Sequence, residues 1–172
     1  MKRFLLVAAL VQLSVESAQA QPRSYMRPRH ATLTFAAGHS TWDLSGTGAS
    51  LLLAARLDRP LGALWLLGEG SFSTFRTEEQ SGQHTYIIPE VQLQVQVPRL
   101  IAPYLGVGAG AISRVSESVG RRTELTTTAA AGVRFWGLFD NGLLRAELRL
   151  RGIGEEFTGS AFEITGGIGW SF

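Results

Sequence analysis

The chain has 172 residues, enough for one domain, and a formal net charge of +2, so no strong field attracts nucleic acid. It contains no cysteine, which excludes a disulfide framework and thiolate metal ligands. Hydrophobic residues make up 45% of the chain, but no run of about 18 apolar residues follows the N-terminal region, which argues against a helical membrane protein.

The first thirty residues carry export features. Lys2 and Arg3 precede an apolar run over 4–13 and the small-residue sequence Ala18-Gln19-Ala20, a pattern typical of a signal peptide. The run is shorter than the ~20 residues of a membrane-spanning helix. We expect cleavage after Ala20, with residues 21–30 forming a proline-rich and arginine-rich periplasmic lead-in.

Eight runs with a period of two follow, each near the ~9 to 11 residues that a tilted membrane strand needs. The predicted strands are 31–39, 49–57, 61–72, 85–97, 103–112, 124–135, 143–151 and 161–172. The fourth is the clearest, because Val91, Leu93 and Val95 alternate with polar residues over too many positions for an amphipathic helix. The third has ambiguous facing, and we place Leu64, Leu66 and Phe72 outward because this sends Glu69 inward.

The predicted connections alternate in length. Those at 58–60, 98–102 and 136–141 are short, whereas 40–48, 73–84, 113–123 and 152–160 are longer and polar. This alternation is typical of an all-β, eight-stranded antiparallel up-and-down barrel over residues 31–172, with tight periplasmic turns and longer outer loops. Both ends of the barrel chain would then lie on the periplasmic side.

Aromatic residues sort toward the two ends of the predicted strands, as in the interfacial girdles of membrane barrels. We place Tyr104, Phe135, Trp136, Trp170 and Phe172 in a periplasmic girdle, and Trp42, Phe72, Tyr86 and Phe162 in an outer girdle. The last strand alternates over Phe162, Ile164, Ile168, Trp170 and the terminal Phe172.

With this terminal strand, the signal peptide and the eight repeats, the chain resembles the small outer-membrane β-barrels of the OmpA transmembrane-domain and OmpX type. The resemblance implies a monomeric transmembrane β-barrel in a Gram-negative outer membrane, in contact with its lipids and lipopolysaccharide. It also implies that the assembly machinery recognises the C-terminal strand. A structural or surface-interaction role without catalysis is the expected function, and no cofactor is expected.

The inward positions of these strands form a predicted polar network in the lumen. An eight-stranded barrel is only wide enough for side chains to fill, so buried charges must pair there. If Arg151 lies opposite Ala161, Arg149 faces Glu163. A narrow porin-like channel for small solutes or ions is the alternative interpretation of the same charges. The network comprises Arg56, Arg134, Arg145, Arg149, Arg151, Glu69, Glu90, Glu124, Glu147, Glu163, Gln92, Gln94 and Gln96.

Other candidate sites are weaker. Gly106, Gly108 and Gly110 continue a strand rather than precede a helix, so they predict space for long inward side chains and not a phosphate loop. His39-Ser40 with Asp43 is a local Ser/His/acid set. Small barrels that modify lipid A make an enzyme a second alternative, but the His-x-Ser motif of the deacylases is absent here.

Two sets of loop residues complete the candidates. His84, Glu78 and Glu79 could join His39 in a surface metal site, although mobile loops do not fix a set of metal ligands, and we expect none. Arg76, Arg121 and Arg122 could contact lipopolysaccharide phosphates, for which a guanidinium fork is suited, or could be solvated. A soluble eight-stranded ligand carrier stays open too, because a period of two does not say which face lies outside.

Overall fold

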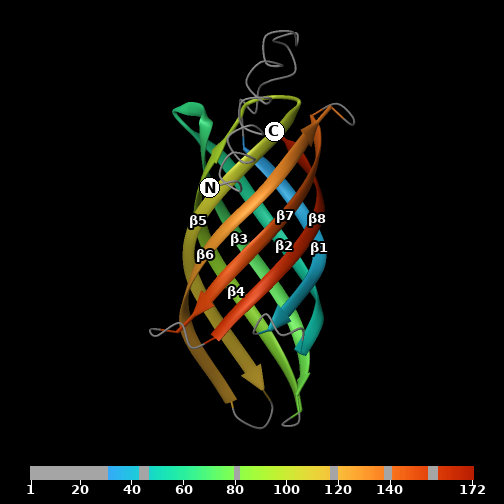
Figure 1. Ribbon diagram of the computed structural model, residues 1–172, viewed down its shortest axis with the longest axis vertical. Helices are drawn as coiled ribbons and strands as arrows, with labels where there is room; N and C mark the ends of the chain where they lie inside the picture. Colours follow the sequence, from blue (N-terminus) through green and yellow to red (C-terminus); the bar gives the residue numbers. More distant parts are fainter. Residues whose placement is uncertain (1–30, 43–46, 80–81, 117–119, 138–140, 155–158) are drawn as a thin grey trace, which may run out of the picture.

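The computed structural model describes residues 31–42, 47–79, 82–116, 120–137, 141–154 and 159–172, which form a closed antiparallel barrel (Figure 1). Each strand pairs with its neighbours in the sequence, and β1 pairs with β8 to close the ring. None of the described residues forms a helix that is long and apolar enough to cross a membrane. The strands are β1 (Thr32–Trp42), β2 (Thr47–Leu61), β3 (Ala63–Glu79), β4 (Gly82–Gln96), β5 (Ile101–Ser116), β6 (Gly120–Trp136), β7 (Gly142–Ile153) and β8 (Gly159–Ser171).

The alternating sequence sets the two faces of the wall. Val91, Leu105 and Leu125 point outward and are 68%, 67% and 70% exposed, whereas the polar residues between them point inward. An apolar exterior around a polar interior is the reverse of what a soluble ligand carrier needs. The structure therefore excludes the carrier interpretation, and the predicted facings of β4, β6 and β7 are confirmed.

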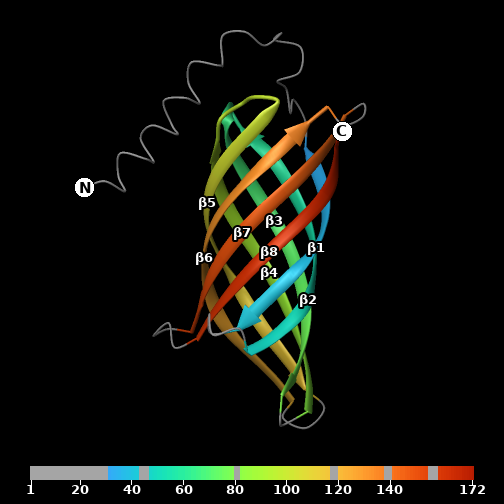
Figure 2. The same ribbon diagram turned by 45° about the vertical axis from the view of Figure 1, so that its right-hand side comes forward.

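The closing register places both ends of the barrel chain together. Thr32 pairs with Ser171, and the N–H of Phe172 donates to the carbonyl oxygen of Ala31 at 3.0 Å. We call this the terminal end of the barrel and the opposite end the distal end; the C-terminus lies at the terminal end in Figure 2.

The first predicted turn, at 58–60, is wrong. β2 continues through these residues to Leu61, and Gly62, with a φ of 80°, makes the reversal into β3. Glycine adopts this positive φ at low cost, which puts the turn two residues later than Pro60 suggested. As a result Asp58 becomes an inward strand residue that is 4% exposed.

Most of the predicted long loops 73–84 and 113–123 is strand. β3 and β4 pair as far as Glu79 and Gly82, and β5 and β6 as far as Ser116 and Gly120. β2 stops pairing with β3 at Phe75, and β7 stops pairing with β6 at Thr126. The distal part of β3–β6 therefore extends beyond the other four strands as a protruding sheet, at the bottom of Figures 1 and 2.

Candidate functional site

Ten charged side chains converge inside the barrel, and each is at most 5% exposed. Five are arginines and five are carboxylates, so their formal charges cancel. We call this set the ion-pair core. Its members are Arg56, Asp58, Glu69, Glu90, Arg134, Arg145, Glu147, Arg149, Arg151 and Glu163.

Two arginines of β7 hold the centre of the ion-pair core. Arg145 contacts Asp58 at 3.2 Å and both Glu69 and Glu147 at 2.5 Å. Arg149, four residues further along β7 on the same inward face, contacts Glu69, Glu90 and Glu147 at 2.8–2.9 Å. The carboxylates come from β2, β3, β4 and β7, so these two guanidinium groups link side chains across the interior.

The core continues toward both ends. Arg134 contacts Asp58 at 2.9 Å nearer the terminal end, and Arg151 contacts Glu163 at 3.0 Å nearer the distal end. Arg56 contacts Glu147 at 2.8 Å. A buried charge is tolerated when it is paired and hydrogen-bonded, and every charge of the core has an opposite charge within 3.2 Å.

Neutral side chains add hydrogen bonds to the ion-pair core, although Nε of Arg56 has no hydrogen-bond partner among the described residues. The Gln94 amide donates to Glu69 at 2.8 Å, and the Thr128 hydroxyl donates to Glu90 at 2.9 Å. The Tyr104 hydroxyl donates to Glu147 at 2.5 Å and accepts from Nε of Arg145 at 2.7 Å. Arg134 also lies over the Tyr104 ring, 4.1 Å from its centroid. These contacts fix the orientations of the charged groups.

An apolar layer fills the interior on the distal side of the ion-pair core. The Phe75 and Tyr86 rings stack there with centroids 4.8 Å apart. Sequence reasoning missed this layer, although its signal is present: the inward positions of β2, β3, β4 and β7 change from charged or polar to apolar beyond Arg56, Ser73, Glu90 and Arg151. The layer comprises Ala36, Leu52, Ala54, Phe75, Tyr86, Ile88, Ile112, Ile153 and Ala161.

The charged residues of the predicted lumen network agree with the ion-pair core except at two positions. Asp58 belongs to the core and was missed because its segment was expected to turn. Glu124 lies outside the core, opposite Ile112 of the apolar layer, and pairs with Arg122 at 2.8 Å; its side chain is 31% exposed. The other predicted charged residues lie in the core, and Gln92, Gln94 and Gln96 line it.

The predicted register of β7 and β8 is confirmed, because Arg149 lies opposite Glu163 and Arg151 opposite Ala161. The expected ion pair between Arg149 and Glu163 is not formed. Arg149 reaches across the narrow interior to β3 and β4 instead, and Glu163 is bound by its diagonal neighbour Arg151.

The aromatic prediction is wrong for two tyrosines. Tyr86 and Tyr104 are 4% and 3% exposed and point inward, because they share the inner face of β4 and β5 with Glu90 and Gly106. They were placed by height along the strand alone. Tyr104 also covers Gly132, whose missing side chain leaves room for the phenol.

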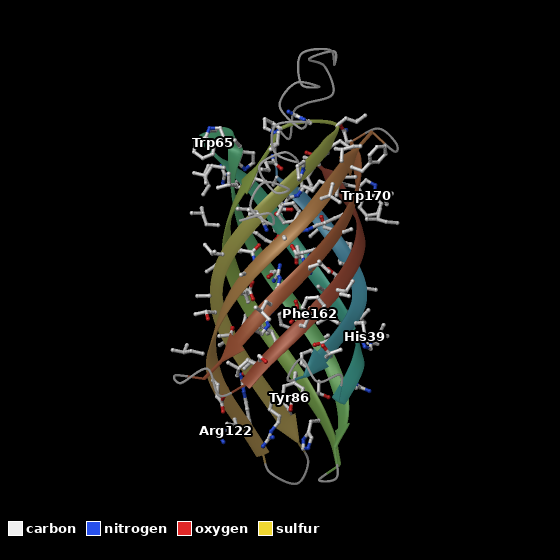
Figure 3. The ribbon with its side chains drawn as sticks, viewed as in Figure 1. His39, Trp65, Tyr86, Arg122, Phe162 and Trp170 are labelled. Carbon is white, nitrogen blue, oxygen red and sulfur yellow. The ribbon has the colours of Figure 1, made fainter. Side chains whose placement is uncertain are left out.

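The remaining aromatics are distributed along the wall. Phe72, Trp170 and Phe172 are exposed on the outside, Phe135, Trp136 and Phe162 are half-buried, and the Trp42 side chain lies outside the described residues. Trp65, which the prediction omitted, is exposed at the same end as Trp170 in Figure 3.

The other candidate sites do not assemble. His39 is exposed on the outer face, whereas Ser40 is 1% exposed and points inward, and Asp43 lies outside the described residues. His84 is buried, and the described residues contain no cluster of three or more metal-binding side chains. Gly106 is a strand residue, and a Cβ there would meet Gln92 and Gln94 at 2.7 and 2.9 Å, so it leaves space for these side chains.

Several solved structures resemble this barrel. Neisserial surface protein A aligns with a TM-score of 0.65 at 15% identity, over 83% of this chain and 96% of that one. The N-terminal β-barrel domain of Pseudomonas aeruginosa OprF gives 0.58 at 16% identity over 82% and 97%. The attachment invasion locus protein Ail of Yersinia pestis gives 0.52 at 14% over 83% and 97%.

No protein-family model matches the sequence, and curated proteins give no significant match. The structural likenesses nevertheless show that the chain shares the fold of these small eight-stranded β-barrels.

Proposed function

We propose that this protein is an integral outer-membrane barrel with a closed interior and a structural or surface-interaction role, without catalysis. The observation that carries the proposal is the combination of an apolar outer wall with a charge-neutral ion-pair core and an apolar layer inside it. The expected signal peptide and the fold shared with solved outer-membrane barrels support this location.

The distal end provides the contacts expected with lipopolysaccharide. Arg76 of β3 and Arg121 of β6 are exposed on the outer face of the barrel. Toward the distal end, the outward residues are first Phe72 and Leu125, then Thr74 and Thr123, and then Arg76 and Arg121. Guanidinium groups just above an apolar belt are placed to bind the phosphates of outer-leaflet lipids. Arg122 points toward the mouth of the barrel instead and is held by Glu124.

The protruding sheet is the proposed interaction surface. The carbonyl oxygen of Leu125 accepts a hydrogen bond from the N–H of Gly154 at 3.0 Å, so it points toward the β7 side of β6. Backbone groups at every second residue of a strand point to the same side, so those of Thr123 and Arg121 also face the β7 side. β7 does not pair with them among the described residues. Such an edge can accept an extended segment from another molecule.

The structure favours this role over the two alternatives. A channel would need a water path through both the ion-pair core and the apolar layer, whose side chains occupy the interior. An enzyme built on His39 and Ser40 would need both side chains on one face, and they lie on opposite faces. Recognition of the C-terminal strand by the assembly machinery and the monomeric state remain part of the proposal.

Because the chain has no cysteine, single cysteines report the orientation directly. Arg76→Cys at the distal end and Arg59→Cys at the terminal end replace two exposed arginines. In intact cells, we expect a membrane-impermeant maleimide to label position 76 and to spare position 59. After lysis both should react. Equal labelling of both in intact cells, or recovery of the protein in the periplasmic fraction, would refute the proposed location.

A further inference from the structure

A small pocket lies at the distal mouth of the barrel, on the outer side of the apolar layer. Its volume is about 80 Å³, and it is lined by Tyr86, Ile112, Ile153, Arg114, Arg122 and Glu124. In Figure 3, Arg122 lies farther toward the distal end than Tyr86. The apolar layer therefore forms the floor and the charged side chains form the rim.

The rim carries one uncompensated positive charge among the described residues. Glu124 pairs with Arg122 at 2.8 Å, and their charges cancel. Arg114, which is half-buried beside them, has no ion-pair partner among the described side chains. A single free guanidinium favours a monoanion, because the nearby Glu124 carboxylate would repel a second negative charge.

The size of the pocket limits its occupant further. Drug-sized ligands fill about 300–1,000 Å³, so this pocket accepts only a group such as one ring. A floor of Ile112, Ile153 and the Tyr86 ring favours an apolar group. We propose that the mouth binds small organic monocarboxylates that carry one apolar ring, with the ring on this floor and the carboxylate on Arg114. The proposal goes beyond the proposed function and does not depend on it.

Binding of phenylacetate to the full chain, folded in zwitterionic detergent, tests this site by saturation-transfer NMR titration. We expect saturable binding by the wild type, and an affinity at least about tenfold lower for Arg114→Gln, because a charge-assisted hydrogen bond is lost. Arg76→Gln is the matched control, since Arg76 is exposed on the outer face and does not line the pocket; its affinity should equal that of the wild type.

Two further probes separate the parts of the proposal. Phenylacetamide, which has the ring but no charge, should bind more weakly than phenylacetate, and so should phenyl phosphate as a dianion. Absence of saturable phenylacetate binding to the wild type would overturn the proposal. Equal affinities for Arg114→Gln and wild type, or for phenylacetamide and phenylacetate, would also overturn it, because the ring alone would then account for the binding.

Discussion

Arg145→Met is expected to lower the free energy of unfolding by ~3–5 kcal/mol, the range measured when one partner of a buried ion pair is removed. Arg145 contacts Asp58, Glu69 and Glu147, and it also donates to the Tyr104 hydroxyl. Its loss leaves nine charges, four positive and five negative, in a space that water enters poorly. Methionine keeps a similar length, so little of the effect comes from lost volume.

Urea unfolding of the protein refolded into lipid vesicles measures this effect. Arg122→Met is the matched control, because Arg122 makes one exposed ion pair with Glu124 and should contribute no more than ~1 kcal/mol. If the Arg145 variant unfolds at the same urea concentration as the wild type and the control, the ion-pair core does not stabilise the barrel and the description of the interior is wrong.

Val107→Arg is expected to destabilise the vesicle-embedded barrel by ~2–4 kcal/mol, the cost of an arginine on the lipid face near the bilayer midplane. Val107 is 64% exposed, points outward from β5, and has Leu93 and Ala129 beside it on the neighbouring strands. The outward residues of β5 are apolar from Ile101 to Ala111, and Val107 lies near the middle of this stretch.

Val115→Arg provides the control on the same strand and the same face. Val115 lies between Thr85 and Arg121, beyond the apolar belt, where an arginine costs ~0–1 kcal/mol. Unfolding in the same vesicles compares the two variants. Equal destabilisation at both positions would mean that the wall is not embedded as the apolar belt indicates.

The strand pattern was predictable because each residue of a strand must choose between lipid-facing and interior positions. The facing of β4 follows from local sequence alone, because apolar Val91 and Leu93 alternate with polar Gln92 and Gln94. The same alternation excludes a β7–β8 register that is shifted by one residue, because such a shift would send Arg149 and Glu163 to opposite faces. It does not exclude a shift by two residues, so the pairing of Arg149 with Glu163 depended on the assumption that Arg151 lies opposite Ala161.

The contents of the interior were less predictable, because they depend on which side chains meet across the barrel. Asp58 was not predicted to lie in the interior, because Pro60 suggested a turn at 58–60. The chain instead reverses at Gly62, and Asp58 stays in the strand. Arg149 contacts Glu69 and Glu90 on strands that are not its neighbours, and no local pattern identifies such partners. The prediction placed Tyr104 in a girdle from its position near a strand end, without asking whether its side chain points inward or outward; it points inward.

The central claim is that the interior is packed and closed. It is tested most directly by recording the current across planar lipid bilayers into which the purified, folded protein has been inserted. Heat-modified mobility on gels would establish that the inserted protein is folded. The ion-pair core and the apolar layer predict no conductance steps above the bilayer background. Regular steps of uniform size from the folded protein would contradict the account and establish the channel alternative.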